Sequence, residues 1–216
     1  MEQVVSDPTQ PALTHPSPDL RSFPSTHLSE GRRVFRSHKA GYHPWWFSIA
    51  PRSGGGRFDL STPRGTCYVA DTIEAAVRER LRETILASRV ITPLLADSFL
   101  VSSFAMPRGF TCAHIGVTKA ARFGVTRELA ALTPGHYPLS REWATAFDDA
   151  GFEGIRYGAR FTPGPANAWA LFGPAGDTMS PYPLVDTVIS GREACHKTKI
   201  KVLPIPRLSA LTVLNP

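Results

Sequence analysis

Short apolar runs, rich in β-branched and aromatic residues and bounded by turn-forming residues, are spread along the chain. Runs of this kind are typical of strands, whereas helical patterns extend over about ten residues or more. The pattern predicts strands over residues 33–36, 65–70, 99–106, 154–157 and 168–172, and residues 200–205 form a further β-prone stretch.

Helical periodicity lies between these strands. It predicts one helix over about residues 71–88, with Asp71 as its cap, and further helices over residues 118–132 and 141–150. Gly151 suits the end of the last helix, because glycine adopts the left-handed conformation that often follows a helix. Helices mixed with many short strands predict an α+β fold. The apolar stripe of the first helix, which we expect to face the core, consists of Ile73, Val77, Leu81 and Ile85.

The domain organisation follows from length and local composition. Residues 1–30 are rich in proline, serine, threonine and aspartate without apolar periodicity, so we expect them to be disordered. A chain of 216 residues is long enough for one well-buried core, which we place at residues 31–175. Residues 176–216 form a proline-rich extension, expected to pack on the domain, whose role the pattern does not indicate.

Composition narrows the expected location. Hydrophobic residues make up 42% of the chain, but no apolar run approaches the roughly 18 residues of a membrane span. The first 20 residues lack the basic and apolar regions of a signal peptide. The 3 cysteines are widely spaced and form no metal-type pair. We therefore expect a cytoplasmic protein with no membrane span, no disulfide framework and no bound metal.

The formal net charge of +6 raises the question of nucleic-acid binding. The densest basic group, Arg78, Arg80 and Arg82, alternates with Glu79 and Glu83 on a predicted helix. This alternation is typical of a solvated, salt-bridged helix face, and a phosphate-bearing ligand or an acidic partner comes next. No helix-turn-helix or aromatic-basic platform is visible, so direct nucleic-acid binding is not expected.

Glu79 is the first candidate for chemistry. Ala75 and Ala76 lie about one helical turn before it on the same flank, and their small side chains leave room for a ligand. The apolar stripe anchors the same helix, which would hold a catalytic acid firmly at the border of the core. The plainer alternative is a surface glutamate that forms ion pairs with its arginine neighbours.

A glycine run supplies the second candidate. Residues 54–56 are all glycine, so the backbone can approach a ligand closely, and Arg57 follows with a guanidinium fork suited to a pyrophosphate. The run is neither a Walker loop nor a dinucleotide fingerprint. Tyr68, on the next predicted strand, is placed to stack on a planar ring. Trp45 and Trp46 are interpreted as a core plug rather than a binding wall.

Short segments in a fixed order carry a resemblance: residues 34–36, 55–59, 65–70, 75–79, 121–124, Trp143, 154–157 and 171–172. Together they resemble the RES domain, the toxin half of RES–Xre toxin–antitoxin modules. The likeness covers about residues 33–173, and Arg57 and Glu79 each lie eleven residues from Tyr68.

The resemblance implies an ADP-ribosyltransferase-like fold, with a split, mostly antiparallel β core and flanking helices around an NAD⁺ cleft. It also implies consumption of NAD⁺ by hydrolysis, phosphorolysis or ADP-ribosyl transfer, and the sequence does not indicate which acceptor is used. By position, Arg36 and Arg57 would hold phosphate or ribose groups, and Tyr68 would pack against the nicotinamide. Glu79 would act at the ribose, which makes Glu79 and Arg57 the candidate catalytic residues.

One position departs from the family pattern. The family has a serine soon after residues 154–157, where this chain has Ala159. The role of that hydroxyl would pass to Asn167, a candidate ligand residue, or to a water. A degenerate relative that binds a nucleotide or protein without turnover is the alternative, and a structural domain with basic helices is the third option.

The resemblance also implies partners. An Xre-like helix-turn-helix antitoxin would silence the toxin by placing its C-terminal segment in the NAD⁺ cleft. A toxin homodimer within that complex is a further expectation.

Overall fold

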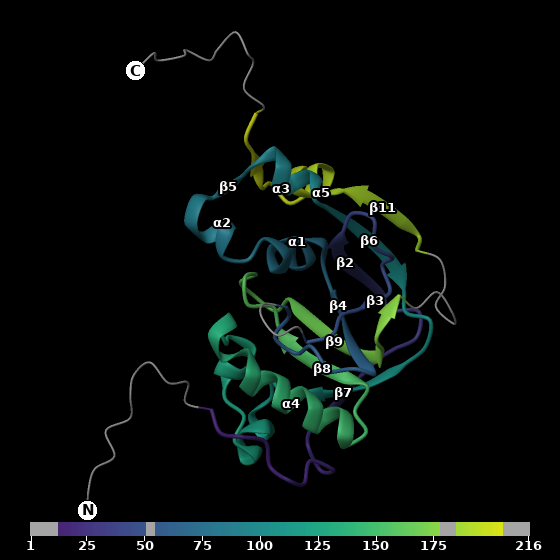
Figure 1. Cartoon of the computed structure of the whole chain (residues 1–216), viewed down its shortest axis with the longest axis vertical. Coiled ribbons are helices and arrows are strands. Elements are labelled where there is room, and N and C mark those ends of the chain that lie inside the picture. Colours follow the sequence, from purple (N-terminus) through teal and green to yellow (C-terminus); the bar gives the residue numbers. More distant parts are fainter. Residues whose placement is uncertain (1–12, 51–54, 178–184, 205–216) are drawn as a thin grey trace, which may run out of the picture.

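The computed structural model describes residues 13–50, 55–177 and 185–204 (Figure 1). Its centre is an eight-stranded sheet in which all neighbouring strands are antiparallel except β7 and β8. In spatial order the strands are β1 (Ser25–Leu28), β7 (Phe110–His114), β8 (Gly154–Gly158), β9 (Asn167–Pro174), β4 (Arg64–Ala70), β2 (Arg33–Lys39), β6 (Phe99–Ala105) and β11 (Thr187–Ser190).

The sheet divides between β2 and β4. These two strands share one registered pair, Phe35 opposite Ala70, whereas β2 pairs with β6 over its whole length and β4 pairs with β9 over its whole length. The strands therefore meet at one point and diverge beyond it. Two small pairs complete the β structure: β10 (Gly176–Asp177) with β3 (Trp46–Phe47), and β12 (Lys201–Val202) with β5 (Val90–Ile91).

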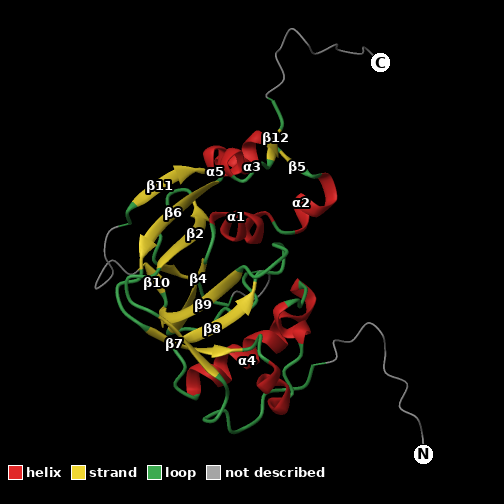
Figure 2. Cartoon of the chain, turned by 180° about the vertical axis from the view of Figure 1, so that it is seen from behind, coloured by secondary structure: helices red, strands yellow, loops and turns green. Residues whose placement is uncertain are grey.

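The helices gather at the two ends of this divided sheet. Figures 1 and 2 show α1, α2, α3 and α5 beside β2, β6 and β11, and α4 beside β7 and β8. The bounds are α1 (Ile73–Leu81), α2 (Glu83–Ser88), α3 (Pro93–Asp97), α4 (Tyr137–Asp149) and α5 (Gly191–Lys197), with 3₁₀ turns at Thr118–Phe123, Arg127–Ala130 and Pro134–His136. The predicted α+β fold, with a split, mostly antiparallel β core and flanking helices, is confirmed.

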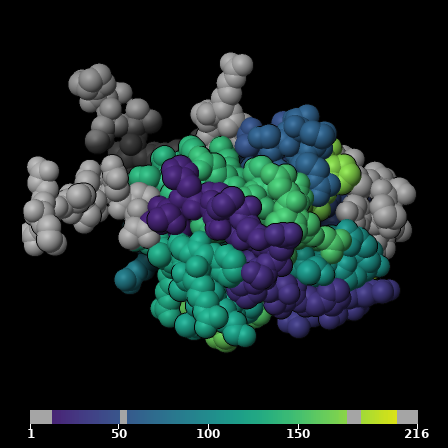
Figure 3. Space-filling model, turned by 90° about the horizontal axis from the view of Figure 1, so that it is seen from below, coloured from purple at the N-terminus to yellow at the C-terminus, as the bar shows by residue number. Residues whose placement is uncertain are grey.

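The expected disorder of residues 1–30 is wrong for residues 13–30. Leu20 and Phe23 are buried, and the Phe23 ring centroid lies 4.8 Å from that of Phe147 in α4. β1 then pairs with β7 and forms one edge of the sheet. Figure 3 shows this purple segment lying across the face that is seen from below. A polar composition thus hid two large apolar anchors, while residues 1–12 lie outside the described residues.

The described part of the C-terminal extension also belongs to the core. β11 pairs with β6 and forms the other edge of the sheet. Ala194 and Cys195 of α5 are fully buried in one cluster with Val77 and Leu81 of α1. The core therefore extends beyond both ends of the expected domain at residues 31–175.

The first predicted helix is interrupted. Thr72, not Asp71, caps α1, because its side chain accepts a hydrogen bond from the Ala75 amide at 3.1 Å. The helix ends at Leu81, and Arg82, with φ of 48°, separates it from α2. The predicted apolar stripe does face the core, since Val77, Leu81 and Ile85 are buried and Ile73 packs against them.

Two other expectations need correction. Residues 118–132 form 3₁₀ turns instead of an α-helix, because Gly124, with φ of +83°, ends the first turn early. β12 covers only Lys201–Val202 of the stretch expected at 200–205, and residue 205 lies outside the described residues. The glycine stop is confirmed, since Gly151 follows α4 with φ of +87°. None of the described helices is both long and apolar enough to cross a bilayer.

Candidate active site

A cleft of about 520 Å³ opens where β2 and β4 diverge. β2 and β4 form its floor, and α1 and the loop after Gly55 form its walls. Four of the predicted site residues line it together, namely Arg36, Arg57, Tyr68 and Glu79. A volume of this size is within the range of small-molecule and cofactor sites.

Glu79 lies in the last turn of α1, and the buried stripe on the opposite flank holds that helix against the core. The side chain is half-buried, and its Oε1 accepts a hydrogen bond from the Phe161 amide at 3.0 Å. The other carboxylate oxygen has no hydrogen-bond partner among the described residues. Ala76 lines the cleft beside it, whereas Ala75 is fully buried in the core. Glu79 is thus fixed at one oxygen and open at the other.

Arg57 is held between aromatic rings at the cleft wall. Its guanidinium carbon lies 5.8 Å from the ring centroid of Phe58 and 5.9 Å from that of Tyr157, within the range of a cation–π contact. The residue is 7% exposed, and its Nε is buried without a hydrogen-bond partner. The Ser140 hydroxyl of α4 donates to the Arg57 carbonyl at 2.6 Å, which fixes the backbone.

Arg36 projects from β2 and is also 7% exposed. Its Nη2 donates to the Trp46 carbonyl at 2.6 Å, and its Nη1 contacts the Cys67 sulfur. Its Nε, like that of Arg57, is buried without a partner. Burial raises the pKa of the Cys67 thiol, and the neighbouring Arg36 charge opposes that rise. Both terminal nitrogens of Arg36 therefore contact the protein, whereas its Nε has no partner.

Tyr68 anchors the glycine-rich loop. Its hydroxyl accepts from the Phe58 amide at 2.9 Å and donates to Asp59 Oδ1 at 2.8 Å. The other oxygen, Asp59 Oδ2, accepts from the Gly56 amide at 2.6 Å. A Cβ at Gly56 would collide with the Tyr68 hydroxyl, so only glycine fits there. Gly54 lies outside the described residues.

Burial raises the pKa of Tyr68 well above its ordinary value, and the Asp59 charge adds to the rise. The hydroxyl therefore stays protonated and remains a hydrogen-bond donor to Asp59. This loop contact is a role that the sequence pattern did not indicate.

Asn167 and Ala159 do not join the cleft. Asn167 begins β9, and its Nδ2 donates to Asp71 Oδ2 and to the Pro165 carbonyl, both at 3.0 Å. It is not among the residues that line the cleft. Ala159 is 8% exposed, and its amide donates to the Ala166 carbonyl at 3.0 Å. The Asn167 side chain therefore does not lie in the cleft, where it would have to lie to replace the expected serine hydroxyl.

Sequence reasoning missed Tyr157 as a cleft residue. It lies on β8, is 4% exposed and lines the cleft between Arg57 and Glu79. Burial raises the pKa of its hydroxyl, and the Glu79 charge adds to this, while Arg57 and Arg82 oppose it. Ile155 and Tyr157 are two residues apart on one strand, so the sequence indicates that they share a face of the sheet. It does not indicate that this face borders the cleft at Tyr157.

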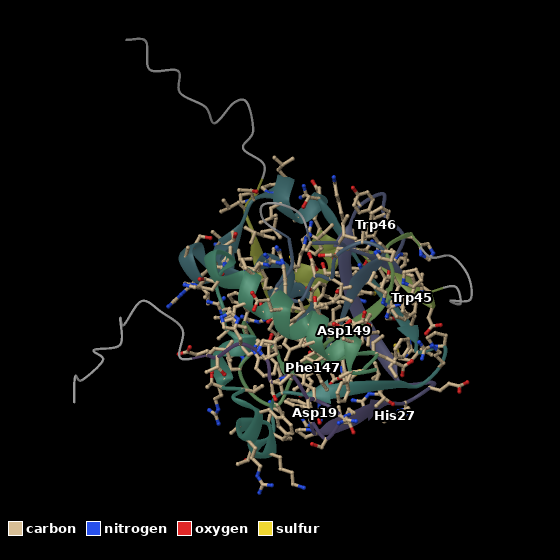
Figure 4. The ribbon with its side chains drawn as sticks, turned by 60° about the horizontal axis from the view of Figure 1, so that its bottom comes forward. Asp19, His27, Trp45, Trp46, Phe147 and Asp149 are labelled. Atoms are coloured by element: carbon tan, nitrogen blue, oxygen red, sulfur yellow. The ribbon has the colours of Figure 1, made fainter. Side chains whose placement is uncertain are left out.

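The two tryptophans have separate roles. Trp45 is fully buried, as the plug interpretation predicted. Both tryptophans are labelled on the right-hand side of Figure 4. Trp46 is half-buried, lines the cleft and stacks on Tyr42 with ring centroids 4.8 Å apart. The plug interpretation is therefore wrong for Trp46.

The expected solvated, salt-bridged helix face is confirmed in its exposure, since Arg80, Arg82 and Glu83 are exposed, but its salt bridges are wrong. Within the described ranges, no ion pair joins Arg78, Arg80 or Arg82 to the intervening glutamates, and Glu83 pairs with Arg160 at 3.7 Å. Arg80 and Arg82 instead line the cleft beside Glu79. Across residues 13–50, 55–177 and 185–204, no group of three histidine, cysteine or acidic side chains could hold a metal ion.

Comparison with known proteins defines the class. The family model of the RES domain matches residues 32–188, and the chain belongs to this family. A solved structure with a similar fold is the M. tuberculosis MbcT–MbcA toxin–antitoxin complex, with a TM-score of 0.59 and 11% sequence identity. The similarity covers 81% of this chain and 92% of the matched chain. No curated protein matches the sequence.

Proposed function

We propose that this chain is a toxin that consumes NAD⁺ by cleaving the bond between nicotinamide and ribose. The observation that carries the proposal is the common cleft of Glu79 and two buried arginines, Arg36 and Arg57. Membership of the RES family supports the toxin role, and so does the similarity in fold to a toxin–antitoxin complex.

The arginines favour a ligand that carries acceptor oxygens. A buried charged donor without a partner is unfavourable, and both Arg36 and Arg57 have such an Nε. The negative charge of a dinucleotide's diphosphate would be balanced by the two guanidinium ions that line the cleft. Binding at these residues would place the rest of the dinucleotide along the cleft.

Glu79 suits the chemistry of the bond to be broken. Cleavage of the nicotinamide–ribose bond builds positive, oxocarbenium-like charge on the sugar, and a nearby carboxylate stabilises that charge. The Phe161 amide fixes one Glu79 oxygen, so the other is held ready to face the ribose. Because the bond electrons return to a cationic nicotinamide ring, that ring leaves as a neutral molecule. Positioning of the substrate supplies much of the remaining acceleration.

The test is mass spectrometry of the products after incubation with NAD⁺, with and without phosphate. We expect free nicotinamide, and the second product distinguishes water, phosphate and protein as acceptors. Glu79→Gln should fold and lose about 10²–10³-fold in rate, because the shape stays and the charge is removed. Glu74→Gln, in the exposed first turn of the same helix, is the matched control. Intact NAD⁺ and no labelled protein under both conditions would refute the proposal.

We further propose an antitoxin partner, an Xre-like helix-turn-helix protein whose C-terminal segment enters the cleft, with a toxin homodimer inside the complex. The fold similarity to a chain from a toxin–antitoxin complex supports an antitoxin partner, and the partner's type, its segment in the cleft and the homodimer rest on the family resemblance. Expression of the toxin together with its neighbouring gene should yield a co-purifying complex that leaves NAD⁺ intact. Recovery of this chain alone, with full activity, would argue against such a partner.

Ala159 favours a second candidate, a module that binds the dinucleotide without turnover. Its methyl group is buried where the family pattern has a hydroxyl. Calorimetry that detects NAD⁺ binding, together with chromatography that finds no free nicotinamide, would support this candidate. Rapid nicotinamide release would exclude it.

A further inference from the structure

Two arginines beside Glu79 have no role in the site described so far. Arg80 and Arg82 lie at the junction of α1 and α2, and both line the cleft. Neither guanidinium has an ion pair or hydrogen bond within the described part of the chain. Both side chains are exposed at the cleft, and neither pairs with the Glu79 carboxylate that lines it with them.

The backbone at Arg82 supports a role for its side chain. Arg82 has φ of 48° and ψ of −132°, a conformation that favours glycine and is unfavourable for a residue with a Cβ. A glycine here would relieve the backbone strain, yet the chain has an arginine whose side chain reaches the cleft. Strain of this kind gathers at functional sites, where the side chain contributes more than its conformation costs.

The charge of Arg82 acts both on Arg80 and on the cleft residue Tyr157. Arg80 is exposed, yet partial burial of its side chain lowers its pKa, and the charge of Arg82 lowers it further, so the two guanidinium ions repel each other. The Arg82 charge also acts on the Tyr157 hydroxyl, the same group on which Glu79 and Arg57 act. An anion bound between Arg80 and Arg82 would remove their repulsion.

We propose that Arg80 and Arg82 form a subsite for a phosphate group beside Glu79. The inference rests on the proposed function, because it adds an anion to the same cleft. Two guanidinium forks match the oxygens of a phosphate, and two positive charges are needed to outweigh the repulsion from the Glu79 carboxylate. The phosphate group is either free inorganic phosphate or a group that the dinucleotide carries.

The first experiment measures binding of inorganic phosphate by calorimetry and by the dependence of Tm on phosphate concentration. Wild-type protein should bind phosphate, and Arg82→Gly should bind it at least 10-fold more weakly, a typical loss for a charged hydrogen bond. Without phosphate, Arg82→Gly should unfold at the same temperature as the wild type or higher, because glycine suits the backbone. Arg80→Gln should show the same loss of affinity, which covers the case in which Arg82→Gly fails to fold.

Arg89→Gly is the matched control. Arg89, like Arg82, is exposed and has a positive φ, 54° with ψ of 3°, but it does not line the cleft. The substitution should leave phosphate affinity unchanged. Glu79→Gln should tighten phosphate binding, since it removes the neighbouring negative charge, and this readout needs no enzymatic activity.

The second arm compares NAD⁺ with NADP⁺ as ligands of the Glu79→Gln variant, with and without Arg82→Gly. A loss confined to NADP⁺ assigns the subsite to its additional phosphate, a loss confined to inorganic phosphate assigns it to the free anion, and a loss for NAD⁺ assigns it to the diphosphate. If Arg82→Gly changes the affinity for none of the three ligands, the proposal is overturned. Phosphate binding that depends on Arg82 in a protein that leaves NAD⁺ intact would retain the subsite and refute the proposed function.

Discussion

The Tyr68 hydroxyl allows a quantitative test of how the glycine-rich loop is held. Tyr68→Phe keeps the ring and removes the atom that bridges the Phe58 amide and Asp59 Oδ1. Phe58 is fully buried, so its amide would lose its partner at a cost of about 1–3 kcal/mol. Asp59 keeps the Ser48 hydroxyl and the Gly56 amide, so its loss adds only about 1 kcal/mol. We expect the free energy of unfolding to fall by about 2–4 kcal/mol.

The assay is urea and thermal unfolding monitored by circular dichroism. For a chain of this length the expected change corresponds to a fall in Tm of roughly 5–15 °C. Tyr42→Phe is the control, because Tyr42 is 44% exposed, and its change should stay within about 0.5 kcal/mol. If Tyr68→Phe changes the free energy of unfolding by no more than the control, the hydroxyl does not anchor the loop and the reasoning is wrong.

Three further outcomes follow from buried groups. Burial, with the Arg36 charge adding to it, lowers the pKa of His38 from 6.5 to about 4, so the unfolded chain binds the proton more readily. The free energy of unfolding should therefore fall by roughly 3 kcal/mol as the pH falls from about 6.5 to about 4. In denaturant titrations His38→Gln should reduce this loss, whereas His27→Gln, at an exposed position, should not. Gly154→Ala should cost about 1–3 kcal/mol, because its Cβ would lie 2.5 Å from a carbonyl oxygen of β9, whereas Gly158→Ala on the same strand meets open space and should be neutral by the same measurement. Phe23→Ala should cost about 3–5 kcal/mol in thermal unfolding, and an effect below about 1 kcal/mol would contradict the burial of the N-terminal segment.

Much of the fold follows from local pattern. β4 and β9 are mostly buried apolar runs, and such runs indicate a strand whichever strand pairs with them, so both could be predicted from the sequence. β1 and β11 were missed because short edge strands depend on pairing with β7 and β6, which lie far away in sequence. The break at Arg82 was missed because neither glycine nor proline marks it.

The site was predictable to the extent that single residues have specific chemistry. Glu79 and Arg57 were identified from their neighbours and from the family pattern, and both line the cleft. The contacts of Arg36 with Trp46 and Cys67 join residues that are 10 and 31 positions away, so only the fold shows them.

The packing of α1 against α5 has a consequence for synthesis of the chain. The helix that carries Glu79 shares its apolar cluster with Ala194 and Cys195, which the ribosome adds more than one hundred residues later. At about 5–20 residues per second, α1 waits several seconds or longer for the surface that covers it. The cleft therefore reaches its final form only near the end of translation. During that interval the nascent chain carries Glu79 on a helix whose core-facing side is not yet covered.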